Sequence, residues 1–441
     1  MDARFHQELQ GRRERLHRQM SSEITQESAA LLLFSNPVQL RNGDVEQPYR
    51  QHSDFYYLTG LEEPEAAALF LPGEPGYVLF VRPRNKERET WEGRRIGVDG
   101  AREEMGADLA HSIEELDAKL LDYLGDTTAL CYLMAEQQQW DRRVLDCVRA
   151  LANKRRKKSP PLAHLYDARA LIHSSRLTKS TFELEKMQEV CELTAGAHLE
   201  AMRRCQPGMT EWQLQDVVEN QFRAGASRRV AYDSIVGSGD NATILHYREN
   251  TREMRAGDLV LIDAGAEKSY YSADITRTFP VAGRFRDIQA RIYQTVLDAQ
   301  LAAIERAQVG ATLDDVHEAA FDVIRAWLDK QGLLGDVADA EARDKRVKQF
   351  FMHRTSHFLG MDVHDVGSYY QDGAPRRLQP HMVITIEPGL YFASDDTSVP
   401  EEYRGVGVRI EDDIVIEPPG PRILTKAAPK TIAEIESACA S

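Results

Sequence analysis

Four carboxylates in the carboxyl-terminal half of the chain interrupt apolar runs that are typical of strands. Asp263 and Asp274 lie in LVLIDAGAEKSYYSADITRTF, Glu387 lies in VITIEPGLY, and Glu411 lies in GVGVRIEDDIVI. A lone carboxylate is costly to bury in such surroundings unless it is paired or binds a cation. Taken one at a time, each could instead lie on the solvent face of a half-buried strand. The four together favour a shared cation site.

The two aspartates are spaced as partners in a hairpin. If two strands turn between Lys268 and Ser269, Asp263 lies directly opposite Asp274. Directly opposed carboxylates repel each other unless a cation lies between them. We therefore expect a cation there, and the alternative is a pair of edge-strand aspartates that point into solvent.

One histidine, His357 in MHRTSHFLGMDVHDVG, adds an imidazole to this donor set. Oxygen-rich ligation with one imidazole suits manganese, and also cobalt or zinc. Four carboxylates balance the charge of two divalent ions, which predicts a two-metal cluster with a bound hydroxide as nucleophile. The HExxH spacing of mononuclear zinc proteases does not occur in the sequence.

Three further histidines are candidates for contacts to a substrate. His353 and His364 flank His357 within twelve residues, and His246 lies in NATILHYREN, before the first of these strands. Imidazoles beside a metal site can hydrogen-bond a substrate carbonyl and stabilise developing oxyanion charge. A lone histidine is more often a structural residue, so the clustering is what favours a role in function.

Composition limits the class of protein. The 441 residues carry 55 Lys and Arg against 70 Asp and Glu, a net charge of −15 at pH 7. This acidity argues against binding to a nucleic-acid backbone. No apolar run is long enough for a membrane span, and the first residues have no signal-peptide pattern. Five cysteines without CxxC spacing are typical of reduced thiols, so we expect a cytoplasmic enzyme.

The amino-terminal part of the sequence alternates between strands and helices. Predicted strands at 29–34, 66–71 and 77–81 precede predicted helices at 112–124 and 138–154. This alternation predicts an α/β domain. The basic stretch KRRKKSPP at 154–161 is interpreted as a solvated loop, because the chain as a whole is acidic.

A change of pattern near Ser175 predicts a domain boundary, with domains at 1–175 and 176–441. Polar capping residues there precede a long helical pattern. A second helix at 211–225 follows. Predicted strands at 258–265, 272–281, 381–392 and 406–416 accompany predicted helices at 287–308 and 312–331. This order predicts an α+β domain with antiparallel sheet.

These motifs together resemble those of a known family. The run HRTSHFLGMDVHD is similar to the signature of aminopeptidase P and prolidase, and LIDAGAEKSYYSADITRTF, ITIEPGLY and VRIEDDIVI match the other motifs of the "pita-bread" metallopeptidases. SDFYYLTGLEEPEAA resembles their amino-terminal domain, so the likeness covers nearly the whole chain. Within this family the motifs resemble those of the bacterial cytosolic Xaa-Pro aminopeptidases. The resemblance implies an α/β amino-terminal domain, a pita-bread catalytic domain, and peptide substrates with proline at the second position.

The resemblance also implies roles for the metal ligands. Asp263 would chelate one ion, His357 and Glu387 would hold the other, and Asp274 and Glu411 would bridge both. Glu387 would serve as general base and proton shuttle as well. Manganese is the expected metal, with cobalt or zinc as alternatives.

Further residues receive roles from the resemblance alone. His246 and His364 would orient the substrate and stabilise the tetrahedral intermediate. The pocket for the proline ring would be lined by His353, Tyr232 and Arg409. Trp91, in ETWEGRRIG, would reach the site of a neighbouring subunit, which implies a homo-oligomer, either a dimer or a tetramer. The sequence departs from the family at Arg354, where glycine is common.

Other functions remain open from the sequence. A prolidase would act on Xaa-Pro dipeptides alone, and a creatinase would share the fold without using metal. A metal-free peptide-binding relative would be expected to lack some of the five ligands, all of which are present here. A dinuclear phosphatase or nuclease would suit the ligands, but the sequence has no pattern of a phosphate-binding loop.

Overall fold

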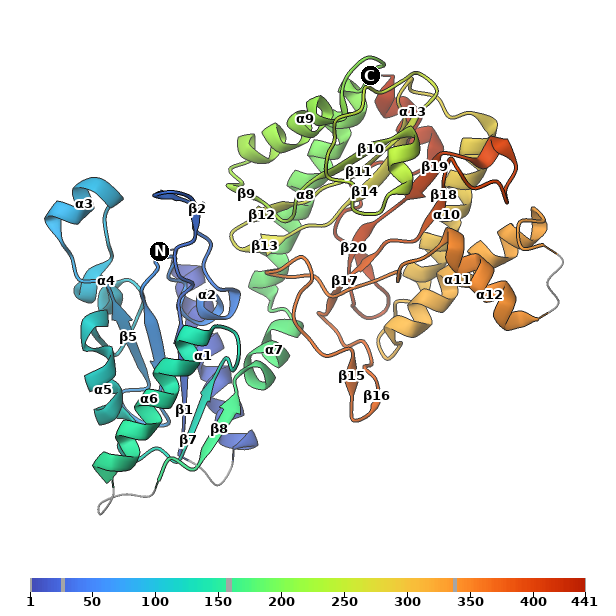
Figure 1. Ribbon diagram of the computed structural model, residues 1–441. Helices are drawn as coiled ribbons and strands as arrows, with labels where there is room; N and C mark the ends of the chain where they lie inside the picture. Colours follow the sequence, from blue (N-terminus) through green and yellow to red (C-terminus); the bar gives the residue numbers. More distant parts are fainter. Residues whose placement is uncertain (1, 25–27, 156–160, 336–338, 441) are drawn as a thin grey trace. The chain divides into compact units, whose positions relative to one another are not determined.

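The computed structural model describes residues 2–24, 28–155, 161–335 and 339–440. The chain divides into two compact units, Met1–Ser175 and Arg176–Ser441 (Figure 1). Residues 156–160, most of the basic stretch interpreted as a loop, lie outside the described residues. No helix within the described ranges combines the length and the apolar character needed to cross a membrane.

The first unit is built on a six-stranded mixed sheet in the order β6-β5-β4-β1-β7-β8. β4 runs antiparallel to β1 and β5, while β5–β6, β1–β7 and β7–β8 are parallel. Every residue of the central β1 is buried, as expected for a strand covered on both faces. The sheet strands are β1 (Ala29–Phe34), β4 (Ala67–Phe70), β5 (Tyr77–Val81), β6 (Leu109–Ser112), β7 (Ala129–Tyr132) and β8 (His164–Asp167).

Helices connect these strands and confirm the predicted α/β class. α6 ends at Arg155, so the helix takes in the first two residues of the predicted loop. The helices of this part of the chain are α1 (Ala3–Glu23), α2 (Ser53–Thr59), α3 (Lys86–Glu92), α4 (Gly97–Glu103), α5 (Leu116–Tyr123), α6 (Gln138–Arg155) and α7 (Arg169–Leu177). A short hairpin, β2 (Leu40–Asn42) with β3 (Val45–Glu46), stands apart from the sheet.

The second unit combines long helices with small antiparallel sheets, which confirms the predicted α+β class. Its described helices are α8 (Thr181–Arg204), α9 (Glu211–Ala224), α10 (Asp287–Arg306), α11 (Leu313–Lys330), α12 (Ala340–Phe350) and α13 (Ile432–Cys439). α8 packs against β12 (Ala266–Lys268) and β13 (Tyr271–Ser272), and α10 packs against β17 (Val383–Ile386), β18 (Gly389–Phe392) and β19 (Val406–Arg409).

The strands of this unit form several sheets with two or three strands each. The three-stranded sheets have the orders β10-β11-β14, β13-β12-β9 and β17-β20-β21, and the pairs are β18–β19 and β15–β16. The remaining bounds are β9 (Arg229–Val230), β10 (Ile235–Ser238), β11 (Leu259–Asp263), β14 (Thr276–Pro280), β15 (Tyr370–Gln371), β16 (Ala374–Pro375), β20 (Asp412–Val415) and β21 (Arg422–Ile423).

The prediction of four continuous strands in this unit is wrong, because each run is broken or shortened near a carboxylate. The run 381–392 divides into β17 and β18 around Glu387 and Pro388, and 406–416 divides into β19 and β20 around Glu411. Proline has no N–H to donate, so it ends the ladder at that point. The two halves of each run then join different sheets.

The predicted hairpin register is also wrong, by two residues. Asp263 pairs with Thr276 rather than with Asp274. The turn lies at Ser269 and Tyr270, which both have positive φ values, 54° and 67°, as two-residue hairpin turns require. A shift by two preserves the face to which each side chain points, so Asp263 and Asp274 still lie on one face as diagonal neighbours.

Candidate metal and substrate site

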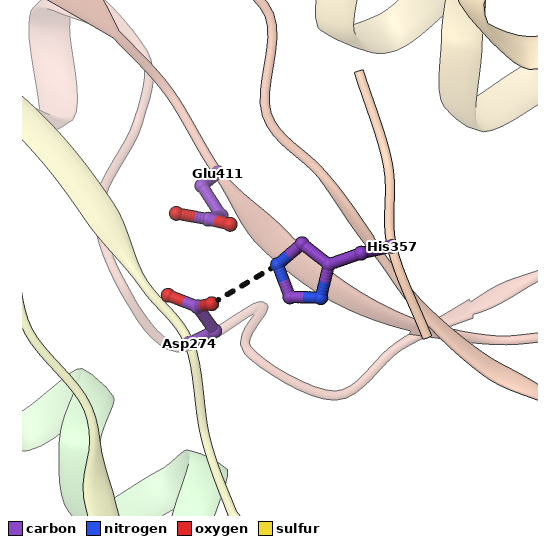
Figure 2. Close-up of side chains that lie close together, drawn as sticks. All are labelled: Asp274, His357 and Glu411. Carbon is purple, nitrogen blue, oxygen red and sulfur yellow. Dashed lines mark ion pairs between the residues drawn. The ribbon is translucent and has the colours of Figure 1, made fainter. Parts of the chain in front are cut away.

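Three predicted ligands meet at the breaks between strands. One donor atom each from Asp274, His357 and Glu411 lies within 4.8 Å of the others. Asp274 lies between β13 and β14, Glu411 between β19 and β20, and His357 in the segment that follows α12 (Figure 2). Asp274 Oδ2 lies 3.4 Å from His357 Nε2. Asp274 is 5% exposed and Glu411 2% exposed, so both carboxylates are held away from water.

Glu387 joins this cluster from the break between β17 and β18. Its Oε1 lies 3.6 Å from His357 Nε2, and its backbone N–H donates to the carbonyl of Thr355. His357 Nδ1 donates to the carbonyl of Phe358 at 3.0 Å, which directs Nε2 toward the carboxylates. Burial lowers the pKa of His357, but the hydrogen bond to Asp274 and the charges of Glu387 and Asp274 outweigh it and raise this pKa to about 9.

Asp263, at the end of β11, contacts the same tyrosine hydroxyl as Asp274. The Tyr232 hydroxyl contacts Asp263 Oδ1 at 2.6 Å and also contacts Asp274 Oδ1. Arg409 donates to Asp263 Oδ2 at 2.5 Å. Burial and the neighbouring carboxylates raise the pKa of Tyr232 well above its ordinary value, so the hydroxyl keeps its proton. The structure therefore places Tyr232 on two predicted metal ligands.

The crowded carboxylates fit a cation. Burial, opposed by His357 and reinforced by Asp274, raises the pKa of Glu387 to about 7. Burial and the same kind of repulsion raise the pKa of Glu411 well above its ordinary value, and the pKa of Asp263 is raised too, although Arg409 opposes it. Such a group of acids cannot ionise together without added positive charge. Oxygen-rich donors with one imidazole suit hard or borderline divalent ions.

Polar neighbours of these ligands were missed in the sequence. Thr276 donates to Glu411 Oε2 at 2.6 Å and accepts from Arg409 at 3.1 Å. Asp413 accepts from the backbone N–H of Asp274 at 3.0 Å. In the sequence, the acidic run Glu411–Asp413 resembles a solvent-exposed face. Only its aliphatic flanks indicated that Glu411 is a candidate ligand and that the two aspartates after it are buried.

A fully buried arginine fixes the backbone that carries Glu411. Arg277 is 0% exposed and donates to the carbonyl oxygens of Thr276 and Glu411. It also donates to Asp412 Oδ1 at 2.7 Å, and Lys430 donates to Asp412 Oδ2 at 2.7 Å. This network connects β14 to the break between β19 and β20, next to the candidate site.

The predicted substrate residues of the second unit share a pocket of about 870 Å³ with the candidate ligands. The His364 ring lies 4.5 Å from that of His357, nearly perpendicular to it. Trp91 belongs to α3 of the other unit and is 90% exposed. The predicted residues that line the pocket are Tyr232, His246, His353, His364, Arg409 and the five candidate ligands.

His353 and Arg409 are joined through Tyr391, which the sequence did not single out. Arg409 donates to the Tyr391 hydroxyl at 3.0 Å, and His353 Nε2 lies 2.9 Å from the same oxygen. Burial, reinforced by Arg409, lowers the pKa of His353 to about 3, so the imidazole is neutral near pH 7. Tyr391 therefore donates to His353 while it accepts from Arg409.

Comparison with known proteins agrees with the family resemblance of the motifs over nearly the whole chain. Residues 185–418 match the model of metallopeptidase family M24, and residues 9–132 match that of the aminopeptidase P amino-terminal domain. The chain belongs to metallopeptidase family M24. The curated Xaa-Pro aminopeptidase of Escherichia coli strain K12 is 42% identical over 435 residues, which cover 98% of this chain and 97% of that protein. The family resemblance read from the sequence motifs is confirmed.

Solved structures of relatives have the same fold. The aminopeptidase PepP of Pseudomonas aeruginosa superposes with a TM-score of 0.95 at 43% identity, covering 99% of this chain and 98% of that one. The aminopeptidase P of E. coli with the inhibitor Pro-Leu gives 0.90 at 41% identity, with the same coverage. The predicted fold class is confirmed, and membership of the family makes this chain a metallopeptidase that uses divalent metal.

Proposed function

We propose that this chain is an Xaa-Pro aminopeptidase, which hydrolyses the bond between an N-terminal residue and a following proline. The observation that carries the proposal is the convergence of Asp274, His357 and Glu411 in one pocket with Glu387 and Asp263 beside them. Relatives that carry this name match nearly the full chain. An Xaa-Pro bond is a tertiary amide, so a site for it needs no partner for a proline N–H.

The proposed cofactor is a pair of divalent ions, with manganese expected and cobalt or zinc as alternatives. A related E. coli structure is described as zinc-substituted, in complex with product. Asp263 would hold one ion, His357 and Glu387 the other, and Asp274 and Glu411 would bridge them. When bound, the ions supply Lewis acidity to the scissile carbonyl and lower the pKa of a water nucleophile.

The chain's own residues then handle protons and orientation. Glu387, which lines the pocket beside His357, would accept a proton from the attacking water and pass it to the leaving proline nitrogen. His246 and His364 line the pocket and would orient the substrate carbonyl. His353 and Arg409, fixed through Tyr391, would contact the proline ring.

Assembly and location are part of the same proposal. Trp91 is a large apolar side chain with 90% exposure, which a second copy of the chain would cover in a dimer or tetramer. The five unpaired cysteines fit a reducing cytoplasm. The net charge of −15 disfavours nucleic-acid partners. Light scattering of wild type and Trp91→Ala would test the oligomer, and an unchanged mass would contradict a role for Trp91 in assembly.

A peptide panel with metal analysis tests the activity. We expect cleavage of Ala-Pro-Ala-Ala at the first bond, little cleavage of Ala-Ala-Ala-Ala, and about two equivalents of divalent metal per chain in the active protein. Activity confined to the dipeptide Ala-Pro would indicate a prolidase instead. Equal cleavage with and without proline would refute the proposed specificity.

A further inference from the structure

An ion pair lies on the exposed part of the pocket wall. The side chains of Arg354 and Asp314 are 58% and 54% exposed and contact each other, whereas Asp274 and Glu411 at the candidate metal site are buried. Arg354 lies between the two histidines of the HRTSH run, and Asp314 lies in the first turn of α11. The pocket therefore passes from a buried acidic end to an exposed part that carries a guanidinium.

The backbone of Arg354 is fixed while its side chain is exposed. A carbonyl oxygen can only accept, so His353 Nδ1 donates to the Arg354 carbonyl at 2.8 Å. The other ring nitrogen of His353 is held by Tyr391, which is held in turn by Arg409. The backbone of Arg354 is therefore held in place, while its guanidinium contacts Asp314 at the exposed end of the pocket.

The pairing with Asp314 is weak enough to be shared or exchanged. Exposed ion pairs contribute little to stability, because water screens the two charges and both side chains lose freedom when they pair. A guanidinium has five N–H donors in a planar fork, so Asp314 does not exhaust its capacity. A carboxylate on a bound peptide can thus join or replace Asp314 at small cost.

The polarity of a peptide substrate matches this arrangement. The N-terminal ammonium must lie near the scissile bond, at the acidic end of the pocket, and the negative charge of the peptide lies downstream of it. Arg248 and Asp233 form a second exposed pair on the wall, 3.6 Å apart. Arg354 is better placed for the downstream charge, because its neighbour His353 belongs to the part of the wall assigned to the proline ring.

We propose that Arg354 is a specificity-determining residue that binds a substrate carboxylate downstream of the proline, in competition with Asp314. The carboxylate is either the C-terminus of a short peptide or an acidic side chain. This inference rests on the proposed function, because it assumes that peptides enter with the proline beside His353.

The test compares substrates that differ in one charge. kcat/KM is measured for Ala-Pro-Ala as free acid and as amide, and for Ala-Pro-Glu-amide against Ala-Pro-Gln-amide. In Arg354→Met the preference for the charged member of at least one pair falls about fivefold, and Arg354→Lys restores part of it. Asp314→Asn raises that preference, because it removes the competing carboxylate. Arg325→Met, which removes an exposed arginine of α11 that pairs with Asp322 and Asp344, leaves it unchanged.

Each outcome decides a separate point. A change confined to the first substrate pair identifies the C-terminal carboxylate, and one confined to the second identifies an acidic side chain. If Arg354→Met lowers kcat/KM equally for charged and uncharged substrates, or leaves all the ratios unchanged, the proposed binding role is overturned. If the wild-type protein cleaves none of these peptides, the proposed function itself fails.

Discussion

Asp412→Asn tests whether the buried network behind the candidate site supports both folding and metal binding. Asp412 is 0% exposed and accepts four hydrogen bonds, two of them from the cations Arg277 and Lys430. The other two come from Gln300 and Thr425. The substitution keeps the shape of the side chain but leaves the buried Arg277 and the partly buried Lys430 without their counter-charge.

The expected loss of stability is large. Removing one partner of a buried ion pair costs about 3–5 kcal/mol. Because Arg277 also donates to the carbonyl of Glu411, the displaced guanidinium shifts a predicted ligand, and metal affinity falls roughly tenfold to a hundredfold. Lys430→Met removes one of the two cations, leaves the Arg277 pair intact, and costs less.

The pH dependence of this effect has a definite sign. Burial raises the pKa of Asp412, but Arg277 and Lys430 outweigh it and hold this pKa below its ordinary value of 3.8. The stabilisation is therefore complete above the unfolded-state pKa and is lost as pH falls through the folded-state pKa. The difference between wild type and Asp412→Asn is full at pH 7 and narrows only below about pH 3.8.

Urea unfolding of the metal-free protein and calorimetric metal titration measure the two effects. Asp322→Asn, which removes an exposed partner of Arg325 on α11, is the matched control and costs less than about 1 kcal/mol. If Asp412→Asn loses no more than the control, the assignment of a strong buried pair is wrong. Lost stability with unchanged metal affinity in Asp412→Asn would refute the link to Glu411, whereas the same result is expected for Lys430→Met, which keeps the Arg277 pair.

Three further variants test the ligands, the buried histidine and the hairpin. Asp274→Ala lowers Xaa-Pro hydrolysis by at least about a hundredfold with unchanged circular dichroism, and substantial turnover in metal-replete buffer would refute its role as a ligand. His198 is fully buried, and desolvation lowers its pKa from 6.5 to about 4, so the unfolded state gains its proton first and stability falls as pH drops from about 6.5 to about 4. In His198→Gln the unfolding free energy depends less on pH, and the loss of stability over that interval is smaller by up to about 3 kcal/mol in total. An unchanged pH dependence would contradict this. A Cβ on Gly265 would lie 1.8 Å from the carbonyl oxygen of Ala273, so Gly265→Ala lowers the melting temperature and weakens metal binding. Gly196 lies in open space on helix α8, so Gly196→Ala raises the melting temperature. Equal shifts of the melting temperature in the two variants would contradict the close approach at Gly265.

The types of the candidate ligands could be predicted because each stands out from its local sequence. A carboxylate within an aliphatic run conflicts with burial unless something compensates it, and that conflict is visible in the residues alone. Glu387 and Glu411 illustrate this, and the structure brings both to the pocket. The strands β1 and β5 were predictable for the related reason that they are short, fully buried apolar runs between turns.

The breaks in the strands could not be predicted from periodicity. The run 406–416 is largely aliphatic apart from Arg409 and its three carboxylates, so nothing local shows that it changes sheet. In the run 381–392, Pro388 indicates that the ladder ends but not that the chain joins another sheet. The hairpin register depended on which two residues take positive φ, and Ser269 and Tyr270 are not typical choices for that conformation. The partners of Asp412 come from β14, α10 and the C-terminal segment, which only tertiary structure brings together.

The position of the carboxylates at strand breaks has a physical reason. Within a continuous strand, neighbouring side chains point to opposite faces, so one strand offers a given site residues at a fixed spacing and direction. A break frees the backbone to turn, and the carboxylate at the break can point along the strand ends rather than perpendicular to the sheet. Asp274, Glu387 and Glu411 each lie between two strands that belong to different sheets. Several short sheets that end near one point can therefore direct more donor atoms into a small volume than one regular sheet could. The interrupted ladders lose hydrogen bonds, and this loss is offset when a cation binds the clustered charges.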